Sequence, residues 1–319
     1  MRIFWLETIT SKDSKRLGFK GLMKRQIVNF GSINIDHVYK VDHFVAPGET
    51  LASESLLTGL GGKGANQSVA MANAGAKVIH VGQLGVADLW AKKALTDFGV
   101  ETSYIKFVAE PSGHAIIQLN KQGENAIIVH GGANQTCLLT DLDKCLRQQS
   151  DVAYLVLQNE CNDVLGAIDL ANGLGIDVVF NPAPMSQDVL ELSLSKLSIL
   201  IVNEVEAQQL WGTRVLIDIK SRLENDCPNI NVIITQGAKG STLLNQHGIQ
   251  HVPALSVTVQ DTTAAGDTYV GFLVAGIANG LPIEVAMKNA SAAAAITTTR
   301  LGAIDAIPSQ KEVKAKIDG

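Results

Sequence analysis

The sequence DTTAAGD at residues 261–267 joins a strand-like run, residues 251–259, to an apolar helix-like run that begins near Thr268. Small residues and a glycine just before a helix let backbone N–H groups converge on an anion, where the helix dipole is positive. The carboxylate of Asp267 would stand beside that anion and could take the proton of a hydroxyl that attacks a phosphate. An Asp at this place can also simply cap the helix. The stretch therefore predicts phosphoryl transfer or a helix cap.

A second informative stretch, GLGGKGANQ at residues 59–67, leads into a small-residue helix expected over residues 68–74. Because Gly61, Gly62 and Gly64 lack side chains, a ligand can lie against the backbone here, while Lys63 and Asn66 supply hydrogen-bond donors. The spacing differs from that of a Walker A loop. Glycine clusters are often plain loops, but one that carries Lys and Asn at the start of a helix indicates a binding site.

Composition restricts the classes of function. The chain has 319 residues and a net charge of -5, with 46% hydrophobic and 18% charged residues, which suits a soluble protein of one large domain or two smaller ones. Neither nucleic acid nor an anionic membrane is an expected partner of such a chain, and its apolar runs are too short to cross a bilayer. Four scattered cysteines without a CxxC pair indicate a reducing compartment and no metal cluster. We therefore expect a cytoplasmic protein.

Residues 1–25 differ from the rest of the chain. They are rich in Lys and Arg but contain no apolar region long enough for a signal peptide. Glu7 and Asp13 argue against a transit peptide. We expect an appended or disordered segment before a single domain at residues 26–319, with Met23 as an alternative start.

Apolar, β-rich runs alternate with helix-like segments along most of the chain. The predicted strands are residues 26–31, 78–81, 104–108, 152–157, 177–180, 199–202, 232–235 and 242–244, with helices between them at 89–98, 163–172, 185–194, 204–211 and near Lys220. This order predicts a mostly parallel sheet covered on both faces. Ligands of such sheets gather at the carboxyl ends of the strands. Polar residues that follow strand-like runs are expected to meet at that edge: Asn34, Glu160, Asn203, Thr235 and Asp267.

Two sets of short strands interrupt this alternation. Residues 38–57 alternate apolar and polar side chains, and residues 113–119 and 125–129 form a predicted β-hairpin. Such strands could cover a site. Asn34 and Asp36 lie just before the first set, and side chains two residues apart share a face in extended backbone, so both could contact one polyol. A plain turn would explain the same spacing.

Four motifs, taken together and in order, carry a resemblance to a known family: GGKGANQ at residues 61–67, NEVE at 203–206, TQGAKG at 235–240 and DTTAAGDT at 261–268. The chain resembles the ribokinase-like, or PfkB, carbohydrate kinases from about residue 26 to about residue 308. The resemblance implies an α/β fold, a three-layer sandwich with a central mostly parallel sheet and a small β-sheet lid formed by residues 38–57 and 113–129. In this family the lid often serves as a dimer interface, which implies a homodimer.

The resemblance also implies roles for single residues. Asp267 is similar to the base that deprotonates the sugar hydroxyl, with the amides of Ala264, Ala265 and Gly266 as the anion hole. The implied sugar pocket consists of Asn34, Asp36, Gly62, Lys63, Asn66, Ala115, Glu160 and Asp267. The implied site for ATP and Mg2+ consists of Asn203, Glu206, Thr235, Gly237, Gly240, Gly266 and Ser291. The implied ligands of an activating monovalent cation, usually K+, are Asp261, Thr263, Thr297, Arg300, Gly302 and Ala306.

Three positions depart from the family's pattern. In GVADLW at residues 85–90 the acidic residue of the usual G-x-D-x-x-G is shifted and Trp90 replaces its second glycine. Ser291 stands where a His or Asn often meets the adenine, and Ala306 replaces a frequent Ser near the cation. These departures bear on nucleotide preference and cation affinity rather than on Asp267.

The resemblance implies ATP-dependent phosphorylation of D-ribose at its 5-hydroxyl. Kinases of the family that act on deoxyribose, fructose or adenosine are alternatives, as is a non-catalytic sugar-binding protein of the same fold. Polar groups such as Asp36, Lys63 and Glu160 favour a small polyhydroxylated sugar, and few aromatic residues argue against a nucleoside base. A dinucleotide-dependent dehydrogenase is disfavoured, because no G-x-G-x-x-G turn follows the first predicted strand.

Overall fold

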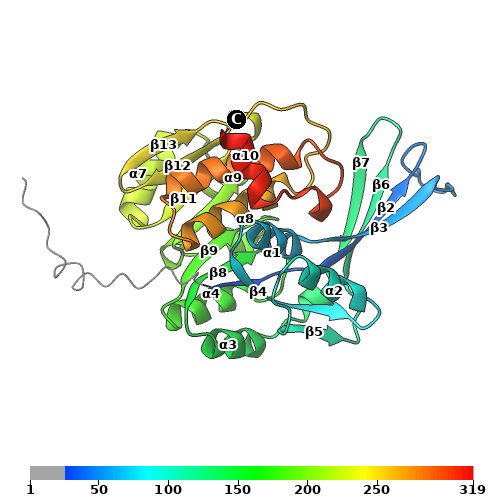
Figure 1. Cartoon of the computed structure of the whole chain (residues 1–319), viewed down its shortest axis with the longest axis horizontal. Helices are drawn as coiled ribbons and strands as arrows, with labels where there is room; N and C mark the ends of the chain where they lie inside the picture. Colours follow the sequence, from blue (N-terminus) through cyan, green and yellow to red (C-terminus); the bar gives the residue numbers. More distant parts are fainter. Residues whose placement is uncertain (1–25, 319) are drawn as a thin grey trace, which may run out of the picture.

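The computed structural model describes residues 26–318, which form a large sheet flanked by helices and a smaller sheet beside it (Figure 1). The larger, nine-stranded sheet has the order β13-β12-β11-β10-β9-β8-β1-β4-β5. Its strands are β1 (Gln26–Phe30), β4 (Lys77–Gly85), β5 (Ile105–Val108), β8 (Val152–Gln158), β9 (Asp177–Asn181), β10 (Ile199–Asn203), β11 (Asn231–Thr235), β12 (Ser241–Asn245) and β13 (Gly248–Val252). Neighbours from β5 to β11 pair in parallel, whereas β12 and β13 add antiparallel at one edge. The predicted mostly parallel sheet is confirmed.

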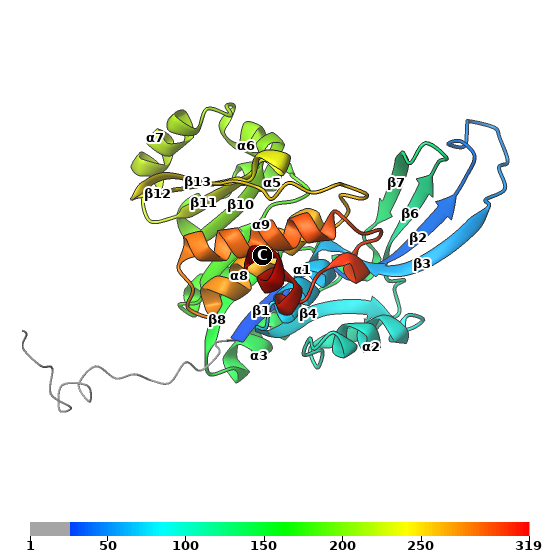
Figure 2. The same ribbon diagram turned by 45° about the horizontal axis from the view of Figure 1, so that its top comes forward.

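Helices cover both faces of this sheet. They are α1 (Lys63–Asn73), α2 (Leu89–Asp97), α3 (Leu139–Gln148), α4 (Val164–Gly173), α5 (Gln187–Leu190), α6 (Glu204–Trp211), α7 (Leu216–Asp226), α8 (Ala265–Ala278), α9 (Ile283–Thr297) and α10 (Gln310–Asp318). One apolar core includes side chains of α1, α8 and α9, and the other includes side chains of α3, α4, α6 and α7; Figure 2 shows α8 and α9 over one face. Ile27 and Val28, adjacent in β1, point into different cores, as expected of a strand that is buried on both faces.

The central helices α1 and α8 pack with almost no space between them. A Cβ on Gly271 of α8 would lie 2.3 Å from the Cβ of Ala70 in α1, so this approach requires a glycine. The contact also brings the first turns of the two helices together, where Asn66 of α1 donates a hydrogen bond to Asp267 of α8.

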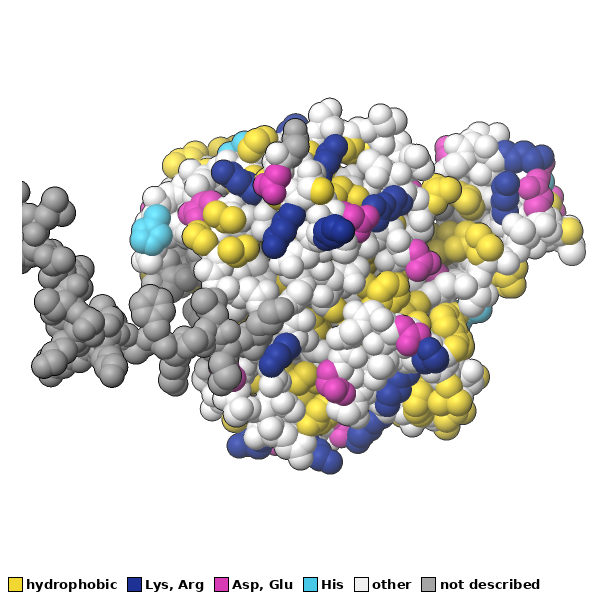
Figure 3. Space-filling view, viewed as in Figure 1, with side chains coloured by type: hydrophobic (Ala, Val, Ile, Leu, Met, Phe, Trp, Pro, Cys, Tyr) yellow, Lys and Arg dark blue, Asp and Glu magenta, His cyan; other side chains and the backbone are white. Residues whose placement is uncertain are grey.

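A small four-stranded sheet projects from the body (Figures 1 and 2). Its order is β3-β2-β6-β7, with β2 (Asn34–Lys40), β3 (Ser55–Gly61), β6 (Gly113–Leu119) and β7 (Asn125–His130). The predicted short strands are confirmed, but the first begins at Asn34 rather than at residue 38, so Asn34 and Asp36 belong to the small sheet itself. Apolar side chains lie open on this sheet (Figure 3), among them Leu57, which is 67% exposed.

The structure corrects several predicted boundaries. The strand expected over residues 251–259 ends at Val252, because Pro253 cannot donate to a ladder. Within residues 185–194 only the short helix α5 forms, and the serines that follow bond to one another instead, with Ser193 Oγ 2.9 Å from Ser195 Oγ. Helix α1 begins at Lys63 rather than at residue 68, and α8 at Ala265 rather than near Thr268.

Two further expectations concern the ends of the chain and the membrane. The basic segment 1–25, with the alternative start at Met23, lies outside the described residues. Within residues 26–318, every helix is too short or too polar to cross a bilayer.

Candidate active site

Two glycines set helix α1 directly on the turn that follows β1. Gly62 has a φ of 89°, and a Cβ on Gly64 would lie 2.4 Å from the backbone nitrogen of Ser32. A larger residue at either position would push the helix away from this turn. The glycines thereby place Lys63 and Asn66, in the first turn of α1, beside the end of β1.

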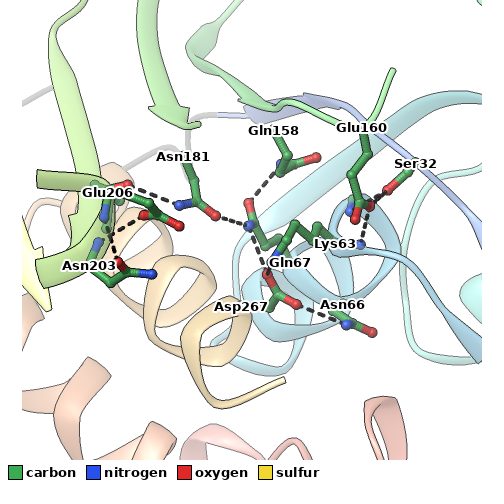
Figure 4. Close-up of polar contacts among 12 residues, drawn as sticks. Ser32, Lys63, Asn66, Gln67, Gln158, Glu160, Asn181, Asn203, Glu206 and Asp267 are labelled. Atoms are coloured by element: carbon green, nitrogen blue, oxygen red, sulfur yellow. Dashed lines mark hydrogen bonds and ion pairs between the residues drawn. The ribbon is translucent and has the colours of Figure 1, made fainter. Parts of the chain in front are cut away.

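Asp267 lies in the first turn of α8 but does not cap it. The N-cap is Ala264, which adopts the left-handed conformation with a φ of 58°. The Asp267 carboxylate accepts hydrogen bonds from Asn66 Nδ2 at 2.9 Å and Gln67 Nε2 at 3.1 Å, and Lys63 Nζ lies 3.8 Å away (Figure 4). Only 6% of Asp267 is exposed. The helix-cap interpretation is therefore wrong, and the carboxylate is oriented by groups of another helix.

The N–H groups at the start of α8 have room for an anion. Ala265 N–H donates to Thr262 O at 3.3 Å, but within residues 26–318 no acceptor faces the N–H groups of Gly266 and Asp267. A Cβ on Gly266 would meet no atom within 4 Å, so the space beside this turn is open. Unpaired N–H groups and the positive end of the helix dipole both favour an anion at this position.

Lys63 brings positive charge to the same place. The Asp267 carboxylate raises the pKa of Lys63, burial opposes this effect, and the charges of Glu160 and Glu206 add to it. The ammonium group is therefore charged at neutral pH.

Two carboxylates lie next to the glycine-rich motif. Glu160 Oε2 accepts a hydrogen bond from the hydroxyl of Ser32 and another, at 2.9 Å, from Lys63 N–H, and burial raises the pKa of Glu160. Asp36 packs against Gly61, where a Cβ would lie 2.0 Å from Asp36 Oδ2. Burial, together with the charge of Glu160, raises the pKa of Asp36 to about 6. Such partly desolvated carboxylates are strong acceptors for the hydroxyl groups of a ligand.

Asn34 is held at the root of the small sheet. Its Oδ1 accepts a hydrogen bond from Asn134 Nδ2 at 2.7 Å. Gly113 leaves room for this pair, because a Cβ there would lie 2.1 Å from Asn134 Nδ2. Ala115 is the register partner of Asp36. Asn34, Asp36 and Ala115 therefore share one face of the small sheet.

The predicted nucleotide and Mg2+ residues begin at the end of β10. Asn203 Oδ1 accepts from the N–H groups of Val205 and Glu206 at 2.8 and 2.9 Å, and Glu206 Oε2 accepts from Asn203 N–H at 2.8 Å. These bonds form a complete capping box at the start of α6. The second carboxylate oxygen of Glu206 has no hydrogen-bond partner among residues 26–318 and stays available to a cation.

The remaining predicted nucleotide residues lie on neighbouring elements. Thr235 ends β11 and is the register partner of Asn203. The turn from β11 to β12 contains Gly237 and Gly240, with φ of 55° and 106°. A Cβ on Gly240 would lie 2.1 Å from Val252 O, so packing alone requires this glycine. Ser291 is buried in α9.

The predicted cation ligands come from two adjacent loops. Asp261 Oδ1 accepts from the N–H and the hydroxyl of Thr263 at 2.9 and 2.6 Å, and Asp261 Oδ2 accepts from Gly302 N–H at 3.0 Å. Burial alone would raise the pKa of Asp261, but these hydrogen bonds outweigh it and lower the pKa. Arg300 donates its N–H to Thr297 O at 3.1 Å and its guanidinium to Ala306 O at 3.4 Å. The two loops meet at Asp261, whereas the carbonyl groups of Thr297 and Ala306 are already engaged.

Several polar residues of this region had no role in the sequence prediction: Ser32, Gln67, Asn134, Gln158 and Asn181. Gln67 lies inside the GGKGANQ motif, but its partners Gln158 and Asp267 are 91 and 200 residues away along the chain. Local spacing does not reveal contacts of that range. A local signal is a polar residue in an otherwise apolar strand, as with Gln158 at the end of β8.

The sequence pattern of the pfkB family carbohydrate kinases matches residues 24–310. The chain belongs to this family. This pfkB kinase is 35% identical to the ribokinase of Haemophilus influenzae over 300 residues, which are 91% of this chain and 97% of that relative. It is 32% identical over 293 residues to the deoxyribokinase of Salmonella typhi, covering 89% of this chain and 95% of the relative.

A solved structure agrees with the family. Arabidopsis thaliana ribokinase complexed with ribose and ATP matches the pfkB kinase with a TM-score of 0.82 at 28% identity, covering 93% of this chain and 100% of that chain. The predicted family, ribokinase-like fold and class of enzyme, an ATP-dependent carbohydrate kinase, are thereby confirmed.

Proposed function

We propose that this pfkB kinase transfers the γ-phosphoryl group of ATP to the 5-hydroxyl of D-ribose. The observation that carries the proposal is the Asp267 carboxylate, which Asn66 and Gln67 hold beside the open N–H groups at the start of α8. The relatives support the choice of sugar and donor. The Haemophilus influenzae relative is a ribokinase, and the Arabidopsis thaliana structure contains ribose and ATP.

In the proposed reaction Asp267 is the general base. Asp267 accepts the hydroxyl proton while the sugar oxygen bonds to the γ-phosphorus and the bond to the leaving ADP oxygen breaks. The turn Ala264, Ala265 and Gly266 stabilises the negative charge of the transferred group, chiefly through Gly266 N–H, because Ala265 N–H also donates to Thr262 O at 3.3 Å. The charged Lys63 adds to this stabilisation, since it lies close to Asp267.

The proposed sugar pocket combines both sheets. Asn34 and Asp36 come from the small sheet, whereas Lys63, Asn66 and Glu160 come from the body. Gly62 and Ala115 keep the pocket free of bulky side chains. Each polar group needs a hydroxyl partner when it is covered, so a ligand that lacks these hydroxyls binds poorly.

We assign the nucleotide to the ends of β10 and β11, with contacts from Thr235, Gly237, Gly240, Gly266 and Ser291. Asn203 and Glu206 would hold the Mg2+–triphosphate. The unpaired carboxylate oxygen of Glu206 fits Mg2+, which takes oxygen ligands and keeps several waters. When bound, Mg2+ supplies charge neutralisation at the phosphates.

A monovalent cation fits the two loops at Asp261. The carboxylate of Asp261 is kept charged by its hydrogen bonds, and the carbonyl groups of Thr263, Arg300 and Gly302 supply further oxygen atoms of the kind that hard cations bind. The carbonyl groups of Thr297 and Ala306 are weaker candidates, since both accept from Arg300. Turnover should rise with K+. Equal rates in K+ and in a bulky organic cation would exclude this site.

The small sheet is proposed to cover the sugar and to contact a second copy of the chain. Leu57, Ile127 and Val129 lie on the face that carries Asp36 and Ala115, and all three are exposed. An open apolar face of this kind favours contact with another protein. Sedimentation of the double variant Leu57→Asp, Val129→Asp should give a monomer where the wild-type chain gives a dimer.

An assay of ADP release with D-ribose, deoxyribose, fructose and adenosine tests the function. D-ribose should give the highest kcat/KM. Deoxyribose is the second candidate, because a deoxyribokinase is 32% identical to the chain. A large preference for adenosine would overturn the sugar assignment, and no ADP release with any of the four would refute the proposed function.

A further inference from the structure

Behind Asp267, buried side chains form a continuous hydrogen-bonded network. Gln67 Nε2 donates to Asp267 Oδ1 and to Asn181 Oδ1, each at 3.1 Å, and Gln67 Oε1 accepts from Gln158 Nε2 at 2.7 Å (Figure 4). Gln67 is 0% exposed and Gln158 is 1% exposed. Amide groups this deep in a core are costly unless they are paired, so two glutamines here call for an explanation beyond packing.

The chemistry of its partners fixes the direction in which the Gln67 amide points. Asn181 Nδ2 donates to Ile201 O at 2.9 Å, so Asn181 Oδ1 faces Gln67. Gln158 donates to Gln67 Oε1, so the amide nitrogen of Gln67 faces Asp267. A flipped Gln67 would set its carbonyl oxygen against the oxygens of Asn181 and Asp267. The donor aimed at Asp267 is therefore locked in place.

The far end of the network is anchored as firmly. Gln158 Nε2 also donates to Asn29 Oδ1 at 3.0 Å, and Asn29 Nδ2 donates to Ser68 Oγ at 2.8 Å. Ser68 Oγ lies 2.8 Å from His80 Nδ1, and His80 Nε2 lies 3.1 Å from a main-chain carbonyl. Burial lowers the pKa of His80 to about 4, so the neutral ring donates from Nε2 and accepts at Nδ1. The network ties Asp267 to β1, β4, β8 and β9.

We propose that Gln67 is a positioning residue for Asp267 and that Gln158 acts by fixing Gln67. The inference rests on the proposed function, in which Asp267 is the base. Because Gln67 is fully buried, it cannot contact a sugar itself. Asn66 holds one carboxylate oxygen of Asp267 and Gln67 holds the other, so the carboxylate cannot rotate. Gln67 should therefore govern the rate of the reaction rather than the affinity for the sugar.

The variant Gln67→Met keeps the length of the side chain and removes the amide. We expect kcat to fall about 10- to 100-fold through lost orientation of the base, with the KM for D-ribose changed less than about threefold. Thr102→Val is the matched control, because it also removes a side-chain hydrogen bond of a buried residue, here the bond to Thr96, but lies in the turn before β5. The control should lower the melting temperature and leave kcat unchanged.

The variant Gln67→Glu tests the pH dependence of kcat, which would not change if Gln67 had only a structural role. A second carboxylate beside Asp267 makes its ionised form harder to maintain. The low-pH limb of the kcat profile should therefore move to higher pH. An unshifted limb in Gln67→Glu, together with wild-type kcat in folded Gln67→Met, overturns the proposal.

If the Gln67 variants do not fold, Gln158→Met decides the question. A lower kcat at unchanged KM supports the proposal, and a wild-type kcat overturns it. Asp267→Asn, measured in parallel, distinguishes the role of Asp267 as the base from the role of Gln67 in positioning it. If Asp267→Asn keeps full activity, both the base and the positioning role are refuted. If Asp267→Asn loses activity while Gln67→Met keeps it, only the positioning role is refuted.

Discussion

Helices α6 and α8 begin near the same site and carry an acidic residue at the same helical position, yet they use it differently. In α6, Asn203 and Glu206 form a capping box that satisfies the first N–H groups. In α8 the N-cap is Ala264, whose side chain has no acceptor, and Asp267 turns toward Asn66 and Gln67. Helix α6 pairs its own donors, whereas α8 leaves donors open.

The comparison indicates that the N-cap residue decides what the acidic side chain at the third helical position does. It either pairs with the helix's own N–H groups or is left available to a ligand. A missing cap costs about 1 kcal/mol, and the left-handed conformation of Ala264 adds on the order of 1 kcal/mol. Local costs of this kind cluster at active sites, where the surrounding structure compensates for them. In α8 the hydrogen bonds from Asn66 and Gln67 hold Asp267 beside this turn.

The largest effect is expected from Asp267→Asn, which removes the base but keeps the size of the side chain. kcat should fall about 10²- to 10⁴-fold, the usual contribution of a general base. Binding of D-ribose, measured by calorimetry without ATP, should change little, because only the transition state needs the proton acceptor. Nearly unchanged turnover would show that α8 differs from α6 only in its cap.

Gly266→Ala sharpens the comparison by moving stability and activity in opposite directions. Alanine stabilises a helix by up to about 1 kcal/mol relative to glycine, but here its Cβ would occupy the open space beside the N–H groups. We expect a higher free energy of unfolding and a kcat about 10-fold lower or worse. Gly173→Ala in α4 is the matched control, since its Cβ would also meet no atom within 4 Å. Equal kcat in the two variants would argue against an anion at this turn.

The variant Glu206→Gln tests whether helix α6, which is capped, also contributes to the reaction. Glutamine can still accept the hydrogen bond of the capping box, so the free energy of unfolding should change by less than about 0.5 kcal/mol. The Mg2+ concentration that gives half-maximal rate should rise by about 10-fold. If a Mg2+ titration gives the wild-type curve, Glu206 serves the cap alone.

The smallest effect concerns stability only. Asn203→Ala removes the cap of α6 and should lower the free energy of unfolding by about 1 kcal/mol, whereas Asn203→Asp keeps an acceptor and should lower it less. Urea denaturation of both variants measures the difference. Equal losses would mean that the capping box does not stabilise α6.

The fold could be predicted where the local sequence pattern of a strand extends as far as its pairing with neighbouring strands. The apolar run at β8 is long and β-rich, and it forms a strand within one residue of the predicted bounds. The run at residues 251–259 is also rich in valine, but it stops pairing at Val252, because Pro253 comes next within the run. Composition alone does not say where a strand loses its neighbour.

The sequence could predict the motif residues of the candidate site, but not the residues that hold those side chains in position. Lys63, Asn66 and Asp267 come together as the motifs imply. The positive φ of Ala264 had no signal, because alanine seldom adopts it. Asn29 and His80, polar residues inside the apolar strands β1 and β4, were the local hint of a buried network. Only the folded chain shows which partners they meet.

The contact between Gly271 and Ala70 packs α1 against α8 so closely that neither helix can shift without disturbing the other, which fixes the GGKGANQ motif relative to Asp267. If the proposed sugar pocket is correct, a change of sugar preference is reached most easily through the small sheet, where β2 and β6 place Asn34, Asp36 and Ala115 outside this helix contact. A designer who wishes to change which sugar this enzyme accepts should randomise those strands and leave the helix pair intact.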